Sequence, residues 1–154
     1  MSYPTPEQLG PPSLRLGFLQ IWVHSRQFPN AQDRWDGNWL NVAVHCGNNG
    51  ASVWANGAIL DTLALSRFRD GIDRIHRTLG GEAVLESDEP NVRVHVQSSD
   101  NTGHLRIRVE ITADNLLQGH WFEFEADQSY LPPLINQLDT ILKTFPIRGI
   151  ENRG

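Results

Sequence analysis

The segment FPNAQDRWDGNWLN, residues 28–41, places two tryptophans among polar, turn-forming residues. Tryptophan is large and rarely left in water, so we expect the indole rings of Trp35 and Trp39 to be largely buried. Asp, Asn and Gly favour tight turns, and the segment contains Asp33, Asp36, Gly37, Asn38 and Asn41. The segment is therefore predicted to be a loop that leads into a strand near Leu40. We expect the two indole rings to anchor this loop to the rest of the protein.

Strands are predicted on both sides of this loop. Residues 14–24 alternate imperfectly and then form an apolar run, which is typical of a strand buried on both faces. Residues 40–46 alternate between apolar and more polar side chains, and the sequence GNNG at 47–50 indicates a hairpin turn. The return strand covers residues 51–60, with a bulge expected at Asn56–Gly57.

Two amphipathic helices are predicted farther along the chain. The first ends at Gly80–Gly81, and its apolar stripe consists of Leu65, Phe68, Ile72, Ile75 and Leu79. The second follows Asp127, a suitable capping residue, carries Pro132 and Pro133 in its first turn and stops at Pro146. Each helix has one apolar side that must pack against the rest of the protein.

Between the helices, the sequence predicts a β-meander of four segments, residues 83–85, 92–97, 104–111 and 121–126. Apolar and polar side chains alternate in them, as in an antiparallel sheet that is wetted on one face. We therefore predict a single α+β domain over residues 14–149, with an antiparallel sheet of about six or seven strands and two helices packed on one face. Residues 1–13 are expected to be a flexible lead-in and residues 150–154 a C-terminal tail.

The composition argues against several classes of function. Of the 154 residues, 39% are hydrophobic and 20% charged, as in a globular domain, and no apolar run is long enough for a membrane helix. The net charge of −5 argues against general nucleic-acid binding and suits a basic protein partner. The first residues lack the pattern of a signal peptide, and Cys46 is the only cysteine, so we expect a reducing, cytoplasmic location and no membrane binding.

No metal site and no cofactor is expected. The histidines show neither zinc-finger nor HExxH spacing, and they are His24, His45, His76, His95, His104 and His120. Asp33, Asp36 and Asn38 resemble part of a calcium loop but lack its twelve-residue pattern. We interpret these three as residues that form turns through hydrogen bonds to the backbone.

No catalytic residue is expected either. Glu123 and Glu125 share one face of a predicted strand, and Arg106 and Arg108 are expected on the neighbouring strand. This arrangement favours cross-strand ion pairs over a pair of hydrolytic carboxylates. Cys46 has the same parity as the apolar residues of its strand, so it is predicted to be a small buried hydrophobe rather than a nucleophile.

Two separated motifs carry a family resemblance. The first is the loop itself, FPN…DxWDGNWLNV, and the second consists of Asp127, Leu131, Leu138 and the sequence FPIRG at 145–149. With Glu89–Pro90 between them, these motifs make the chain resemble the WapI-like family of bacterial immunity proteins over roughly residues 14–149. Members are thought to be intracellular antidotes that bind the toxic domain of a secreted toxin. The resemblance implies a non-enzymatic, cytoplasmic binding protein whose partner is a cognate toxin domain.

The resemblance also separates structural from binding residues. A motif shared by antidotes that meet different toxins should maintain the fold, so we expect structural roles for Asp33, Trp35, Asp36, Asn38, Trp39, Phe145, Pro146, Arg148 and Gly149. The partner is expected on the polar sheet face that points away from the helices. Its candidate residues are Arg93, His95, Arg106, Arg108, Glu123 and Glu125, aided by the acidic run at 82–89.

Two other functions are compatible with the sequence. One is a small enzyme of unknown class, with a pocket under the loop of residues 28–41 that uses Asp33 or Asp36 and a nearby histidine. The other is a protein that self-associates, for example as a homodimer. A pocket with paired carboxylates or a metal would favour the enzyme, whereas a toxin gene immediately upstream would favour the antidote.

Overall fold

The computed structural model describes residues 5–99 and 102–150. The chain has the predicted α+β class. Its elements, in order, are α1 (Pro6–Leu9), β1 (Leu14–Leu16), β2 (Leu19–Arg26), β3 (Trp39–Asn48), β4 (Ala51–Asp61), α2 (Thr62–Thr78), β5 (Glu82–Glu86), β6 (Val92–Ser98), β7 (His104–Ile111), β8 (His120–Asp127), the 3₁₀ helix η1 (Gln128–Tyr130) and α3 (Leu131–Thr144).

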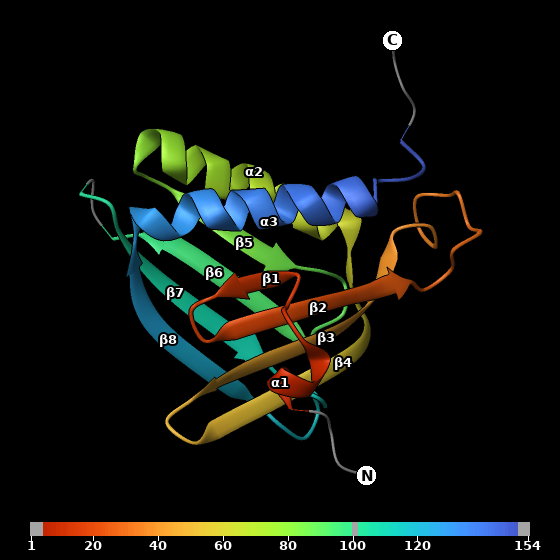
Figure 1. Ribbon diagram of the computed structural model, residues 1–154, viewed down its shortest axis with the longest axis horizontal. Coiled ribbons are helices and arrows are strands. Elements are labelled where there is room, and N and C mark those ends of the chain that lie inside the picture. Colours follow the sequence, from red (N-terminus) through yellow and green to blue (C-terminus); the bar gives the residue numbers. More distant parts are fainter. Residues whose placement is uncertain (1–4, 100–101, 151–154) are drawn as a thin grey trace.

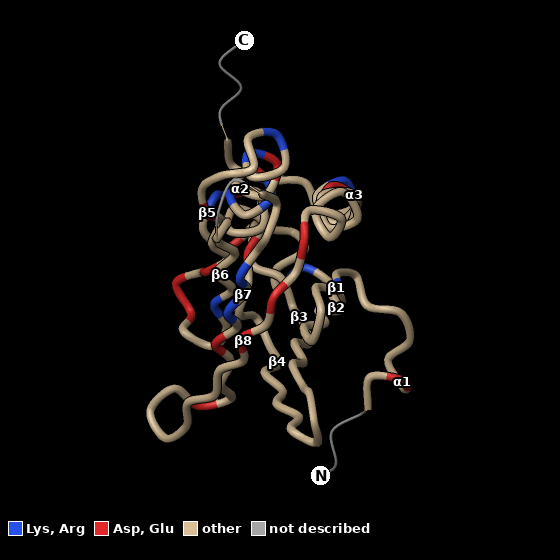
Figure 2. Tube along the Cα trace, turned by 90° about the vertical axis from the view of Figure 1, so that its left-hand side faces the viewer, with Lys and Arg blue, Asp and Glu red and all other residues tan. Residues whose placement is uncertain are grey.

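The strands form two antiparallel sheets, so the prediction of one sheet with six or seven strands is wrong. Their strand orders are β1-β2-β3-β4 and β5-β6-β7-β8. Figure 1 shows α2 and α3 side by side above both sheets, and Figure 2 shows the two sheets on different sides beneath them. Since α2 contacts β5 and α3 contacts β1, the helices bridge the two sheets instead of covering one face of a single sheet.

The two sheets bury their apolar faces in one shared core. Ile21 of the first sheet and Ile107 of the second have no exposed surface and belong to the same hydrophobic cluster. Phe18, in the turn before β2, packs on Phe124 of β8 with 4.7 Å between ring centroids. Alternation predicts that each strand has one apolar face, but it does not specify which strands pair or what covers that face. The single-sheet prediction failed for this reason.

The first predicted strand, residues 14–24, is in fact a hairpin of β1 and β2. The chain reverses at Gly17, which has a φ of 56°. A Cβ atom there would lie 2.3 Å from the ring of Phe124, so only glycine fits this turn. The predicted turn at residues 47–50 is confirmed, because Asn49 and Gly50 both have positive φ and join β3 to β4 directly. The return strand does contain a bulge, but it lies after the predicted position: Asn56 and Gly57 pair in register with Ala43 and Val42, and the register shifts between Gly57 and Leu60.

Helix α2 is held at both ends and along one side. The Asp61 carboxylate accepts a hydrogen bond from the Ala64 amide at 2.7 Å and so caps the N-terminus. At the other end Leu79, not one of the predicted glycines, adopts the left-handed conformation with φ of 58°. Gly71 lies inside the helix because a Cβ there would come within 2.7 Å of the Ala83 Cβ on β5.

The described part of the predicted lead-in lies against the outer face of the first sheet. Trp22 Nε1 donates to the Gly10 carbonyl at 3.0 Å, and the Val23 amide donates to Ser13 Oγ at 3.0 Å. The Trp22 ring stacks on Trp54 of β4, with 5.7 Å between centroids. The outer ends of the predicted lead-in and tail, residues 1–4 and 151–154, lie outside the described residues.

Candidate functional site

The two motifs of the resemblance lie against each other in space. Asn38, which is 1% exposed, joins the loop of residues 28–38 (the Trp loop) to the C-terminal segment of residues 145–149. Its Nδ2 donates to the carbonyls of Arg34 and Arg148, and its Oδ1 accepts from the Arg148 amide at 2.9 Å. Thr62, at the start of α2, donates its hydroxyl to the same oxygen at 2.7 Å. One amide side chain thus fixes three segments to one another.

Two arginines extend this junction. Arg148 Nη1 donates to the carbonyls of Pro29 and Ala31 at 2.7 and 2.8 Å. Arg26 is 7% exposed and donates to the Gly37 carbonyl at 2.6 Å and to the Pro146 carbonyl. Burial lowers the pKa of Arg26, and the nearby positive charge of Arg148 lowers it further. These guanidinium groups are occupied with backbone carbonyls inside the fold.

Glycines allow the two segments to approach closely. A Cβ on Gly149 would lie 2.3 Å from the Arg34 amide nitrogen, and the φ of Gly149 is 74°. A Cβ on Gly37 would lie 2.4 Å from the Asp33 carbonyl oxygen. The motif glycines are therefore required by backbone contact, which favours the structural interpretation of the Trp loop.

Asp33 organises the exposed part of the Trp loop. Its Oδ2 accepts hydrogen bonds from the amides of Trp35 and Asp36 at 3.2 and 3.0 Å, as expected for a turn residue. The hydrogen bond from Asp36 is the main reason why the pKa of Asp33 is lowered. The expectation that both indole rings are buried is wrong for Trp35, which is 73% exposed, whereas Trp39 is half-buried. Trp35 does not pin the loop.

A pocket of about 400 Å³ lies beside the Trp loop. It is lined by Arg34, Trp35, Asn38, Trp39, Asp61, Leu63, Arg67, Glu86, Ser87 and Asp88. The enzyme hypothesis requires Asp33 or Asp36 together with a histidine, and none of these lines the pocket. The carboxylates that do line the pocket are Asp61, which caps α2, Glu86, which pairs with Arg93, and Asp88, so the pocket differs from the one that this hypothesis predicts.

The six residues expected to bind a partner share the outer face of the sheet β5–β8. In the strand register, His95 lies opposite Arg108, which lies opposite Glu123. Arg106 lies opposite Glu125 in the next row, and Arg93 lies opposite Glu110 in the row on the other side. The sequence prediction that alternation would bring these side chains to one face is confirmed by the register. Whether they bind a partner stays a prediction.

Most charges on this face are already paired with one another. Arg93 Nε lies 3.1 Å from Glu86, and His95 Nε2 lies 2.6 Å from Glu82. Arg108 contacts Glu110 at 3.3 Å and Glu123 at 2.8 Å, and its hydrogen bond to Glu123 is the main reason why its pKa is raised. The expected cross-strand ion pairs are thus confirmed for Arg108. Arg106 has no carboxylate at ion-pair distance among residues 5–99 and 102–150.

This face is acidic overall. It carries three arginines, Arg93, Arg106 and Arg108, against six carboxylates, Glu82, Glu86, Glu110, Glu123, Glu125 and Asp127. Figure 2 shows the mixture of acidic and basic residues along these strands. Because acidic groups are in excess, the face is complementary to a basic surface.

The sequence prediction missed the hydrophobic side chains at one end of this face. Trp121 of β8 is 60% exposed and lies under the Arg108 guanidinium, 4.8 Å from the ring centroid. In the loop between β7 and β8, Leu116 is 87% exposed and Leu117 is 83% exposed. The signal in the sequence was a pair of adjacent leucines within the polar segment ADNLLQGH, which an amphipathic pattern does not explain.

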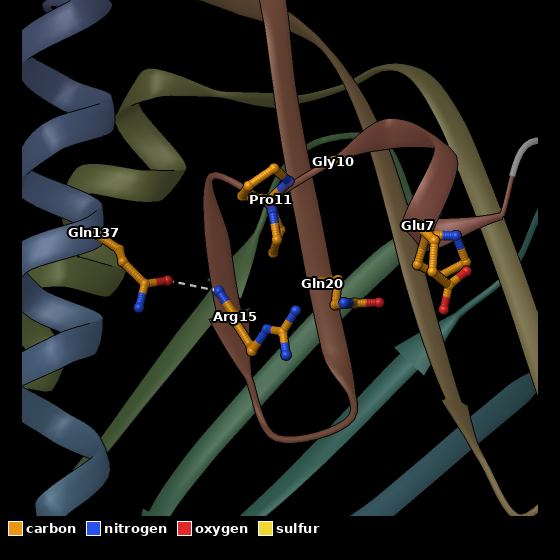
Figure 3. Close-up of a pocket in the computed structure, with 8 residues that line it drawn as sticks. Glu7, Gly10, Pro11, Arg15, Gln20 and Gln137 are labelled. Atoms are coloured by element: carbon orange, nitrogen blue, oxygen red, sulfur yellow. Dashed lines mark hydrogen bonds between the residues drawn. The ribbon is translucent and has the colours of Figure 1, made fainter.

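The outer face of the other sheet holds a buried histidine and a groove. His45 bonds to Gln20 Oε1 through Nδ1 and to Ser52 Oγ through Nε2, and burial lowers its pKa while Glu7 opposes this change. The groove, of about 500 Å³, runs between the N-terminal segment and α3 (Figure 3). There Gln137 accepts a hydrogen bond from the Arg15 amide at 2.6 Å. None of the residues predicted to bind a partner lines this groove.

Cys46 is fully buried, as predicted, and burial raises its pKa to about 12. Such a thiol is not activated as a nucleophile at neutral pH. Within the described parts of the chain, no three His, Cys, Asp or Glu side chains are grouped so that they could hold a metal ion. In the same parts, none of the helices has the length and apolar character needed to cross a membrane.

Comparison with known proteins identifies the family. The model of the immunity protein WapI-like family matches residues 13–146, which is most of the chain and includes the Trp loop. Neither a comparison with curated proteins nor one with solved structures finds a match. The match confirms the resemblance that the two motifs indicated. The chain belongs to the WapI-like immunity protein family.

Proposed function

We propose that this protein is a cytoplasmic immunity protein that neutralises a cognate toxin domain by binding it directly, without catalysing a reaction. Membership of the WapI-like immunity family over residues 13–146 is the observation that carries this proposal. The single cysteine, Cys46, is free and buried, which is consistent with a reducing compartment.

In this proposal the toxin domain binds the outer face of β5–β8. Arg93, His95, Arg106, Arg108, Glu123 and Glu125 share that face, which supports its assignment as the contact surface. The Trp loop is not assigned to the contact, because its buried polar groups are bonded to the C-terminal segment. Binding would block the toxin sterically.

The negative charge of this protein supports a toxin domain that is basic. The protein carries a net charge of −5, and the proposed face has an excess of carboxylates. Opposite charges accelerate encounter, and this acceleration weakens as salt screens the interaction. An antidote that must capture its toxin quickly benefits from such steering.

The test asks whether a toxin domain is encoded immediately upstream of this gene, and whether this protein protects a cell that expresses that domain. Co-expression of the immunity protein should restore growth, and the two purified proteins should form a complex in calorimetry. A toxin domain from an unrelated locus is the control and should remain toxic. If the purified proteins do not bind, direct neutralisation is wrong.

A further inference from the structure

We infer that Trp121, Leu116 and Leu117 form the apolar centre of the toxin-docking surface, and that the paired charges around them are its rim. The inference rests on the proposed function and specifies which part of the face supplies the affinity. The partner it implies is a folded basic protein domain with an apolar depression that receives the leucines.

The first observation is the degree of exposure. Leu116 and Leu117 expose 87% and 83% of their surface, and Trp121 exposes 60%. They belong to one end of the sheet, because β8 begins at His120 directly after the loop that carries the leucines. Clustered exposed apolar side chains with polar surroundings mark interaction sites, whereas scattered ones need no explanation.

The loop holds the leucines outward. Asp114 Oδ1 accepts a hydrogen bond from the Leu116 amide, and the Asp114 carbonyl accepts from Leu117 and Gln118 at 3.2 and 2.9 Å. Thr112, which is 7% exposed, donates its hydroxyl to the Gln118 carbonyl at 3.2 Å. A surface ordered before binding loses less conformational entropy when the partner arrives.

Trp121 lies at a groove beside the loop that carries the leucines. The groove measures about 290 Å³ and is lined by Pro90, Arg108, Glu110, Ile111, Thr112, Gly119, His120 and Trp121. Tryptophan in such a position is the residue type that most often dominates binding energy at protein interfaces.

The charged side chains of the face are poor candidates for this role. Arg93, His95 and Arg108 already have carboxylate partners on the protein itself at 2.6–3.1 Å. A partner would have to replace contacts that exist, and exposed ion pairs contribute little net free energy. Leu116 and Leu117 are almost fully exposed and have no ion pair to lose, so burying them gives a net gain in binding free energy.

Charge selects the class of partner. Six carboxylates face three arginines on the sheet, and Asp88, Glu89 and Asp114 lie in the loops at the same end. An anionic membrane surface or a nucleic acid would be repelled by this excess. A basic protein surface would be attracted to it.

The test compares two variants with two matched controls, and its probe is the purified toxin domain against which the wild type protects cells in the experiment above. Leu116→Ser/Leu117→Ser and Trp121→Ala should each weaken its binding in calorimetry by about thirtyfold or more, as expected for a hot spot. Ile150→Ser and Phe28→Ala remove side chains that are 58% and 45% exposed outside the strands and loops of this face, and should change binding by less than about threefold. Thermal unfolding of all four should match the wild type, since surface substitutions have small effects.

Four outcomes would overturn the inference. If the wild type binds the toxin domain and both test variants bind equally well, the apolar centre is wrong while the proposed function stands. If the wild type does not bind it, the proposed function and this inference both fail. A dimer of the wild type in sedimentation that the leucine variant loses would assign the patch to a second copy. Cosedimentation with phosphatidylcholine vesicles would assign it to a lipid surface.

Discussion

Asn38 and Arg148 lie 110 residues apart in the chain and exchange two hydrogen bonds. Asn38 Nδ2 donates to the Arg148 carbonyl at 3.0 Å, and the Arg148 amide donates to Asn38 Oδ1 at 2.9 Å. This reciprocal contact closes the Trp loop onto the segment that follows α3. The Trp loop and the FPIRG segment of the second motif are thus parts of one structural junction, whose disruption should affect stability before it affects binding.

Asn38→Ala should destabilise the protein by about 2–4 kcal/mol, because it leaves several buried donors and acceptors unpaired at a cost of about 1–3 kcal/mol each. Urea denaturation measures this. Asn41→Ala is the control. The Asn41 side chain donates a hydrogen bond to Ser25 Oγ at 3.1 Å, and its loss should cost only about 1 kcal/mol. Equal midpoints for the two variants would contradict the central role of Asn38.

The two tryptophans of the loop should behave differently. Trp39→Ala should cost roughly 1–3 kcal/mol, less than the 3–5 kcal/mol of a fully buried aromatic, because Trp39 is half-buried. Trp35→Ala should change the free energy of unfolding by less than about 0.5 kcal/mol, since the side chain is 73% exposed. Urea melts of both variants decide the matter. A large loss at Trp35 would mean that the exposed indole supports the loop after all.

Gly149→Ala should be strongly destabilising, by about 2 kcal/mol or more. The new Cβ would overlap the Arg34 backbone at 2.3 Å, and alanine disfavours the left-handed φ of 74°. Gly119→Ala is the matched control, because nothing lies within 4 Å of a Cβ built there. Thermal denaturation should separate the two. If Gly149→Ala melts with the wild type, the close approach of the two segments is not required.

His45 should make stability depend on pH near neutrality. Burial lowers its pKa in the folded state, so as the pH falls the unfolded chain, whose histidine titrates at about pH 6.5, takes up its proton before the folded protein does. The free energy of unfolding should therefore fall as the pH decreases from 7 to 5.5, and should not vary through His45 above pH 7. His45→Gln should flatten this dependence in urea melts. A wild-type stability that is constant over this range would contradict the effect of burial.

Charge reversal at Glu123 and Glu125 should slow association with the toxin domain about tenfold at low salt and leave the dissociation rate nearly unchanged, because rim charges act on encounter. Stopped-flow measurements at increasing salt should show the difference from the wild type shrinking. Glu7→Lys/Asp70→Lys changes the net charge equally but lies on α1 and α2 rather than on this sheet, so it should slow association less. An unchanged association rate in the Glu123→Lys/Glu125→Lys variant would remove this face from the encounter.

The sequence by itself determined the individual helices, strands and turns, because each depends on residues that are close together in the chain. Alternation of apolar and polar residues specified β6, β7 and β8, and helical spacing specified α2 and α3. The pair Asn49 and Gly50 specified its hairpin through backbone conformation alone. The same alternation brought Arg108 and Glu123 to one face, so the composition of the candidate surface could be predicted without knowledge of the tertiary structure.

Only the tertiary structure decided how these elements combine. An apolar strand face can be buried by helices or by a second sheet with a comparable gain in hydrophobic free energy. The division into two sheets therefore depended on which strands pair with one another. Trp35 and Trp39 are the same residue type in one loop, and their different burial depends on which neighbours reach them. Asn38 could be recognised as a turn residue, but its partner Arg148 is supplied by chain folding over 110 residues. The chemistry of a side chain can be read from the sequence, whereas its burial and its hydrogen-bond partners are decided by the packing of the folded protein.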